Sequence, residues 1–170
     1  MAGAINGLAQ CERMLGRLDS AEELYQKAMT LAASSGNNHT VAITLLNLAM
    51  VAVERGAAPR ARAMLLEVFS MAELGRARST MQSALECCSG LASLVGQWER
   101  AARFYGAAEA MAAATGLRRD AADEAFLAPQ VEKARARLEP AAFDAAEREG
   151  RATSSISAID GARGWLKEMA

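Results

Sequence analysis

Apolar residues recur every three or four positions between Ala84 and Ala114, and this spacing predicts two amphipathic helices. The two apolar stripes are Leu85, Cys88, Ala92 and Val95, then Trp98, Ala101, Tyr105, Ala108 and Ala112. Side chains at such intervals share one helix face, so each stripe predicts a buried surface. Gly96 lies between them, where a glycine can end one helix in a left-handed turn and let the next run back antiparallel. The stretch therefore predicts an αα-hairpin.

The same pattern recurs with a period of 40 residues, because glycine occupies positions 16, 56 and 96. Six further columns keep this interval: Leu8, Leu48 and Cys88; Ala9, Ala49 and Ser89; Leu18, Ala58 and Trp98; Ala21, Ala61 and Ala101; Tyr25, Leu65 and Tyr105; Ala28, Val68 and Ala108. Matched columns in three copies indicate an internal repeat, which is typical of helical solenoids.

These columns resemble the tetratricopeptide repeat, in which a helix pair carries leucine and a small residue, a glycine at the turn, and then small, aromatic and small residues. In the first copy they are Leu8, Ala9, Gly16, Leu18, Ala21, Tyr25 and Ala28. The resemblance implies an all-α fold, a right-handed α–α superhelix in which residues 1–116 form three helical hairpins. We expect residues 117–170 to add capping helices to the same domain. The period of 40 exceeds the usual 34 or so, which implies longer helices or linkers.

Local signals suggest where the helices of residues 1–116 begin. Asp19 or Ser20, followed by glutamates, reads as a capping box, and the segment 34–39 reads as a loop. Pro59 suits the first turn of a helix that ends near Gly75, and Ser79 or Thr80 can cap the next. The first helix starts almost at Met1 without a polar capping segment, so we expect further hairpins upstream in a longer parent chain.

Beyond Thr115 the period breaks, and the pattern predicts helices over 120–138, 140–149 and 154–169. Pro129 should kink the first of these or split it in two, since an interior proline removes a backbone donor. Ser154 suits the cap of the last.

Residues 84–160 resemble the C-terminal repeat region of large bacterial ATP-dependent transcriptional regulators of the LuxR/AfsR type. The resemblance rests on the hairpin of residues 84–111 and on a closing set of residues, Phe143, Gly150, Arg151, Ala152 and Ser154. It implies the sensor or interaction end of a signalling or transcriptional regulator. ATP binding is not implied, because no phosphate-binding loop ending in Gly-Lys-Ser/Thr is present.

Charge and hydropathy narrow the classes of partner. The formal net charge is −1, and Lys and Arg form no cluster, so we expect neither direct nucleic-acid binding nor a membrane-surface contact. No run of about 18 uncharged apolar residues and no secretory leader occur in the sequence. We therefore expect a cytoplasmic protein whose three cysteines, Cys11, Cys87 and Cys88, are reduced.

Catalytic signals are few, so we expect a non-enzymatic protein without cofactor or metal. The single histidine, His39, lies in the predicted loop without a second ligand at helical spacing. Carboxylates such as Asp123 and Glu124 belong to mixed-charge helices, where they are typical of a solvated face.

The repeat register predicts a concave groove lined by the first helix of each hairpin. Its candidate partner-binding residues are Asn6, Gln10, Arg13, Leu46, Asn47, Met50, Val53, Glu86 and Ser93. An apolar centre at Met50 with polar ends suits a protein or peptide partner, or another domain of a longer parent chain. Alternatively, the chain's own C-terminal helices or a second copy in a homodimer cover this strip. A further hypothesis is a small-molecule effector domain, which requires a closed apolar pocket with a few polar groups.

Overall fold

The computed structural model describes residues 1–75 and 77–169, and these residues form helices and no strands. The helices are α1 (Ala2–Met14), α2 (Leu18–Ser34), α3 (Asn38–Glu54), α4 (Ala58–Gly75), α5 (Arg78–Leu94), α6 (Trp98–Thr115), α7 (Ala121–Arg137), α8 (Pro140–Ala152) and α9 (Ser155–Glu168). The all-α class predicted from the repeat is therefore confirmed.

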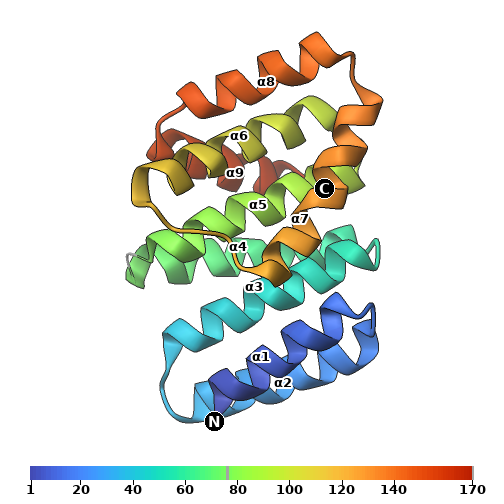
Figure 1. The fold of residues 1–170 in the computed structure, drawn as a ribbon. Helices are drawn as coiled ribbons and strands as arrows, with labels where there is room; N and C mark the ends of the chain where they lie inside the picture. The colour runs from blue at the N-terminus through green and yellow to red at the C-terminus, as the bar shows by residue number, and fades with distance from the viewer. Residues whose placement is uncertain (76, 170) are drawn as a thin grey trace.

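The first six helices form three hairpins, α1–α2, α3–α4 and α5–α6, which follow one another along a stack (Figure 1). The turns at Gly16, Gly56 and Gly96 have φ angles of 73°, 74° and 76°. This left-handed conformation is strained for residues with a side chain, which explains why glycine recurs at these corners. The predicted turn chemistry is confirmed at all three positions.

Small residues allow the two helices of each hairpin to approach closely. Ala21, Ala61 and Ala101 are fully buried at the same column of the repeat. In the third hairpin, the hydroxyl of Ser89 also donates to the carbonyl oxygen of Ala101 at 2.8 Å, which ties α5 to α6. Close packing of this kind leaves little room for larger side chains.

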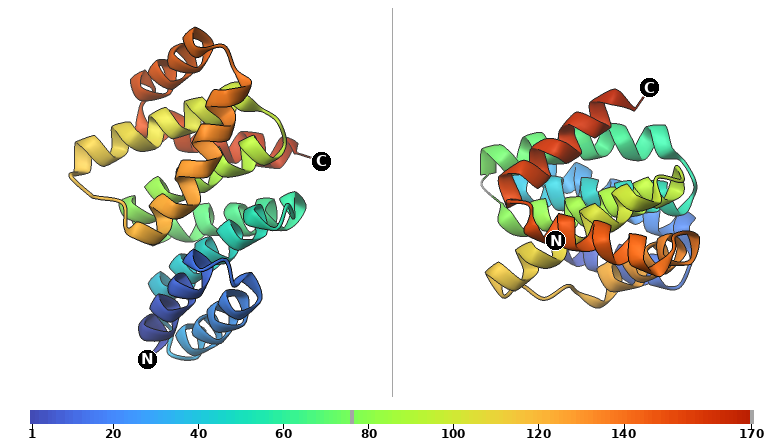
Figure 2. Two further views of the ribbon diagram at one scale, coloured as in Figure 1. Left: turned by 45° about the vertical axis from the view of Figure 1, so that its right-hand side comes forward. Right: turned by 90° about the horizontal axis from the view of Figure 1, so that it is seen from above.

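The last three helices pack on different sides of the stack. α7 crosses the stack steeply and contacts α1, α5 and α6, whereas α9 packs on α4, α5 and α6 on the opposite side (Figure 2). α8 runs in the same direction as α6 (Figure 1), and two glycines permit the close contact: a Cβ added at Gly106 would lie 2.1 Å from the carbonyl oxygen of Glu147, and one at Gly150 would lie 2.0 Å from that of Arg103.

α7 is one continuous helix with Pro129 in its interior, so of the two expected outcomes, a kink or a split, the split is wrong. The ring projects from an exposed position, and tertiary packing of the buried residues Phe126 and Leu127 holds the helix together across it.

Several predicted helix ends also need correction. α2 begins at Leu18 with no side-chain cap, so no capping box forms at Asp19 or Ser20. α5 begins at Arg78 before Ser79 and Thr80, and α8 continues through Gly150 to Ala152.

His39 belongs to α3 rather than to a loop, because Asn37 caps this helix by accepting a hydrogen bond from the Thr40 amide at 3.0 Å. At α9 the prediction holds, since the Ser154 hydroxyl accepts from the Ser157 amide at 3.1 Å.

Candidate functional site

The nine residues predicted to line a groove lie on α1, α3 and α5, and we call the surface that they form the groove face. Eight of them are buried: Asn6, Arg13, Leu46, Asn47, Met50, Val53, Glu86 and Ser93. Gln10 is partly exposed. The repeat register thus places these side chains together along the first helices, but it does not reveal that almost none of them reaches the surface.

α7 covers the groove face through polar contacts along its length. The Gln10 amide donates to Asp120 at 3.3 Å, just before α7 begins. One turn on, Arg13 pairs with Asp123 at 3.4 Å. Farther along the helix, the Ser93 hydroxyl donates to the carbonyl oxygen of Gln130 at 3.0 Å.

Apolar packing completes this cover, because Phe126 of α7 lies against Gly90 of α5. A Cβ added at Gly90 would stand 2.6 Å from the Phe126 ring, so a side chain there would push the ring away. The structure therefore has the arrangement in which the chain's own C-terminal helices fill the groove. The eight buried residues are covered by α7 and by the packing of the first helices on one another, so an external partner cannot reach them in this arrangement.

The segment leading into α7 is held by Arg119. Its guanidinium contacts Glu86 at 3.0 Å, Glu124 at 2.7 Å, and Glu109 of α6. Burial raises the pKa of Glu86 above its ordinary value, although Arg119 opposes this effect. If the linker moved away with Arg119, the buried carboxylate of Glu86 would lose its partner and remain desolvated, which is costly. The network therefore holds the linker in this position.

Sequence reasoning missed Arg119, Asp123 and Phe126 as groove contacts. Gly90 was the available signal, since a glycine in the middle of a helix often marks a close approach by another element. Gly90 alone, however, does not indicate which element approaches it.

A small polar pocket of about 170 Å³ opens where the start of α7 meets α1, α3 and α5. We call it the polar pocket; its lining is Gln10, Ile43, Leu46, Asn47, Ser79, Thr80, Ser83, Asp120 and Asp123. Burial, followed by the nearby Asp120, raises the pKa of Asp123 to about 6, while Arg13 opposes the rise. Residues with carboxylate, amide and hydroxyl side chains from four parts of the fold thus line a common space.

An apolar stripe follows the outer side of α1, and we call it the end face: Met1, Ala4, Leu8, Cys11 and Leu15. The exposed fraction is 52% for Leu8 and 63% for Leu15, and Cys11 is also exposed. The intervals of three and four residues place these side chains in one line along the helix. The end face lies at the end of the stack away from α8 (Figure 1).

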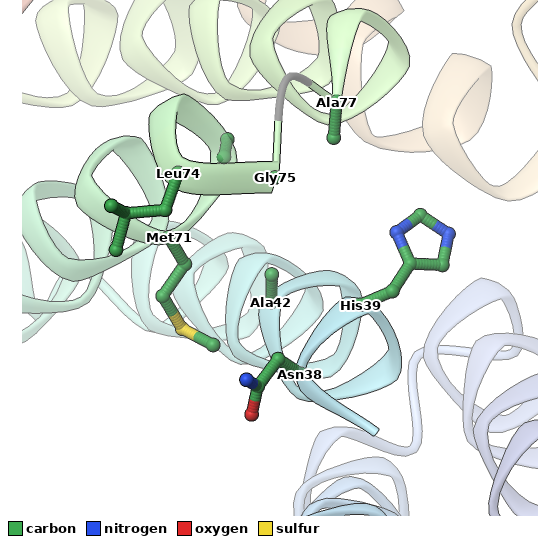
Figure 3. Close-up of a pocket in the computed structure, with 8 residues that line it drawn as sticks. Asn38, His39, Ala42, Met71, Leu74, Gly75 and Ala77 are labelled. Carbon is green, nitrogen blue, oxygen red and sulfur yellow. The ribbon is translucent and has the colours of Figure 1, made fainter. Parts of the chain in front are cut away.

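A hollow of about 380 Å³ lies between the start of α3 and the end of α4. Met71 and Leu74 stand on the α4 side, and the His39 ring and the Asn38 amide point in different directions (Figure 3). Because its polar groups do not converge, the hollow has no arrangement suited to acid–base chemistry.

The described residues offer neither a metal-binding cluster nor a helix that could cross a membrane. Within residues 1–75 and 77–169, no group of three His, Cys, Asp or Glu side chains is placed to hold a metal ion. None of the helices described above combines the length and the hydropathy needed to cross a membrane.

A stack of glycine-turned helical hairpins defines the structural class, and comparison with known families agrees with it. Residues 1–74 match the family model of the tetratricopeptide repeat, so this part of the chain is a TPR-like helical domain. Comparisons with curated proteins and with solved structures give no match. Tetratricopeptide repeats generally mediate protein–protein interaction, and proteins built from them are generally non-catalytic scaffolds.

Proposed function

We propose that this protein is a non-catalytic interaction scaffold that binds an amphipathic helix on its end face, supplied by a partner protein or by another domain of a longer parent chain. One observation carries the proposal: Leu8 and Cys11 are exposed, whereas their counterparts one repeat later, Leu48 and Val51, are 2% and 1% exposed. The same positions are therefore solvent-facing on α1 and core on α3.

The contact between α2 and α3 indicates what the partner helix should look like. Leu48 and Val51 of α3 pack in one cluster with Ala21 and Tyr25 of α2. The end face carries the equivalent side chains one repeat earlier, so it suits a helix that presents a small residue and a bulky residue four positions on. A contiguous exposed apolar surface of this kind is typical of a protein-binding site.

The wider setting is part of the same proposal. We infer that the chain forms the interaction end of a bacterial signalling or transcriptional regulator in the cytoplasm, on the strength of the resemblance of residues 84–160. We also infer that residues 117–170 serve as capping helices in one domain with the hairpins of 1–116. The support is the single hydrophobic core shared by α3 through α9.

A synthetic peptide of residues 18–34, which reproduces α2, is the most direct probe of the end face. We expect it to bind the full chain and to shift the amide signals of Leu8 and Cys11 in NMR spectra. Leu8→Glu should weaken binding at least tenfold, because it places a charge in the apolar contact. A chain with Thr30→Glu, a substitution at an exposed position on α2, should bind the peptide as the native chain does.

Equal affinity of the native chain and Leu8→Glu would reject the end face as the binding surface. Sedimentation of the chain without peptide separates a partner helix from a second copy. A dimer that Leu8→Glu dissolves would mean that the end face binds another copy of the chain instead.

A second candidate function is an effector-binding domain of such a regulator. The observation that favours it is a largely apolar hollow of about 390 Å³ between α5, α6 and α9, lined in part by Met81, Met111 and Ile159. Arg78 stands in its lining as a cation, so the hollow suits a small apolar acid. Octanoate is a suitable probe, and Arg78→Gln should weaken its binding if this function is right.

A further inference from the structure

Three cations lie over tryptophan rings where α7 ends beside the turn between α5 and α6 (Figure 2). The ammonium nitrogen of Lys133 lies 5.9 Å from the centroid of the Trp98 ring, and the guanidinium carbon of Arg137 lies 5.8 Å from it. On α6, the guanidinium carbon of Arg100 lies 5.5 Å from the ring centroid of Trp165. We call the exposed part of this surface the basic patch: Trp98, Arg100, Lys133, Arg137 and Leu138.

The three cations of the basic patch are unpaired. Their neighbours Arg103 and Arg135 each pair with two carboxylates. Arg100, Lys133 and Arg137, by contrast, have no ion-pair partner among residues 1–75 and 77–169. A guanidinium that stacks on a ring keeps its N–H donors at the edge of its plane, so they stay available to an acceptor. Positioned cations without acceptors indicate an anionic ligand.

An open hollow beside these cations gives such a ligand a place to lie. Its volume is about 430 Å³, and Trp98, Arg100 and Leu138 are among the residues that line it. Trp98 packs on the hydrophobic core while part of the residue stays exposed, so its ring is a firm apolar surface. Tryptophan in such a position is a frequent anchor of protein interfaces.

We propose that the basic patch binds an acidic peptide segment of a partner protein, in which carboxylates flank an aromatic residue. The carboxylates pair with the cations of α6 and α7, and the aromatic ring lies against Trp98 and Leu138. A polyanion with a charge on every unit, such as a nucleic acid, suits the surface less well. Glu99 lines the same hollow and Glu139 is exposed next to Leu138, so a continuous row of negative charges meets repulsion there.

The basic patch is separate from the end face. It belongs to α6, α7 and the residue that follows α7, whereas the end face belongs to α1. The two surfaces can be occupied at once, so a negative result at either one leaves the other untouched.

The probe for the basic patch is the peptide acetyl-Asp-Glu-Phe-Asp-Glu-amide, titrated into the ¹⁵N-labelled full chain at constant ionic strength. We expect saturable shifts of the indole N–H signal of Trp98 and of the amide signal of Leu138. Arg137→Gln should weaken binding about threefold, and the double variant with Lys133→Gln should weaken it at least tenfold. Arg148→Gln is the matched control, because it removes the same charge at an exposed position on α8, and it should bind the peptide with native affinity.

Two further peptides separate the parts of the proposal. Acetyl-Asn-Gln-Phe-Asn-Gln-amide has the same shape without the charges and should give no shifts, and acetyl-Asp-Glu-Ala-Asp-Glu-amide lacks the ring and should bind more weakly. The proposal is wrong if the uncharged peptide reproduces the shifts, if the alanine peptide binds equally well, or if the double variant keeps native affinity. Tighter binding of a thymidine octanucleotide or of phosphatidylglycerol vesicles at the same ionic strength would also overturn it, because the patch would then serve a nucleic acid or a membrane.

Discussion

Individual glycines in this protein serve two different purposes, and the contact between α6 and α8 shows the less obvious one. Gly106 lies in the interior of α6, where glycine is ordinarily a poor choice. Here it lets the backbone of α8 approach, since the nearest atom to an added Cβ is the carbonyl oxygen of Glu147. Backbone atoms cannot move aside as a side chain can.

We therefore expect Gly106→Ala to destabilise the chain by about 3 kcal/mol, because the new methyl group overlaps the backbone of α8. Gly161→Ala on α9 is the matched control, since nothing lies within 4 Å of its added Cβ. That control should raise stability by about 0.5–1 kcal/mol through its better helix propensity. Urea denaturation measures both. A Gly106→Ala chain as stable as the native one would show that α6 and α8 are not in close contact.

Asp123 gives the stability of the chain a dependence on pH. Burial and Asp120 raise its pKa to about 6 in the folded chain, from an ordinary value of 3.8. The folded state then holds the proton more tightly than the unfolded state. This carboxyl group contributes most stability below about pH 4, and the contribution is lost as the pH rises through 6.

Asp123→Asn removes this titration. Between pH 4 and 6, the free energy of unfolding of the native chain should fall relative to that of the variant by roughly 1 kcal/mol per pH unit. Chemical denaturation of both chains at several pH values gives the difference. A difference that rises with pH would mean that Arg13 dominates and that the pKa of Asp123 is lowered instead.

At the scale of the element, α7 is held by its contacts rather than by its own helix propensity. Pro129 supplies no amide hydrogen, and its ring crowds the carbonyl oxygen of residue 125. The helix persists because Phe126, Leu127 and Val131 are buried against the stack. Tertiary packing therefore outweighs an unfavourable residue in this element.

Replacing Pro129 with alanine should consequently stabilise the chain by about 1–3 kcal/mol, because it restores a helical hydrogen bond at an exposed position. Thermal unfolding monitored by circular dichroism is a sufficient measurement. Glu132→Ala, an exposed change on the same helix, should have little effect. A loss of stability in Pro129→Ala would show that the ring itself packs against a neighbour.

The element scale also shows where local signals mislead. Serine, threonine and aspartate suit helix caps, but they are tolerated inside the first turn, which is where α2 and α5 hold them. Asn37 is as good a cap as any residue of the segment 34–39, and once it takes that role, His39 falls within α3. The choice between adjacent polar residues is decided by packing of the helix that follows.

At the scale of the whole molecule, the hairpin stack could be predicted from sequence because the same hairpin pattern occurs three times along the chain. The corners at Gly16, Gly56 and Gly96 fix where each helix pair turns, and the equal interval fixes which faces meet. Such information is local, since each hairpin contacts mainly its neighbours.

The position of α7 could not be predicted in the same way. Its contact with α1 joins Gln10 to Asp120, which are 110 residues apart in the sequence. No repeat column includes Asp120, Asp123 or Phe126, so nothing in the spacing connects them to the groove face. The groove residues were placed on a common face by the register, whereas the contacts of Gln10, Arg13 and Ser93 with α7 depend on this long-range packing.

Reactivity of the three cysteines tests the whole arrangement in one measurement, because each reports on a different surface. Cys11 belongs to the end face and is exposed, while Cys87 and Cys88 are fully buried. Cys87 occupies the repeat position of Asn47 on the groove face, and Cys88 occupies that of Leu48 between hairpins.

In native buffer, thiol labelling followed by mass spectrometry should modify Cys11 rapidly and leave Cys87 and Cys88 protected until the chain unfolds. Rapid labelling of Cys87 with full helicity retained would contradict this arrangement, because it would mean that α7 leaves the groove face open. Protection of Cys11 in the free chain would likewise contradict an end face that is open to a partner.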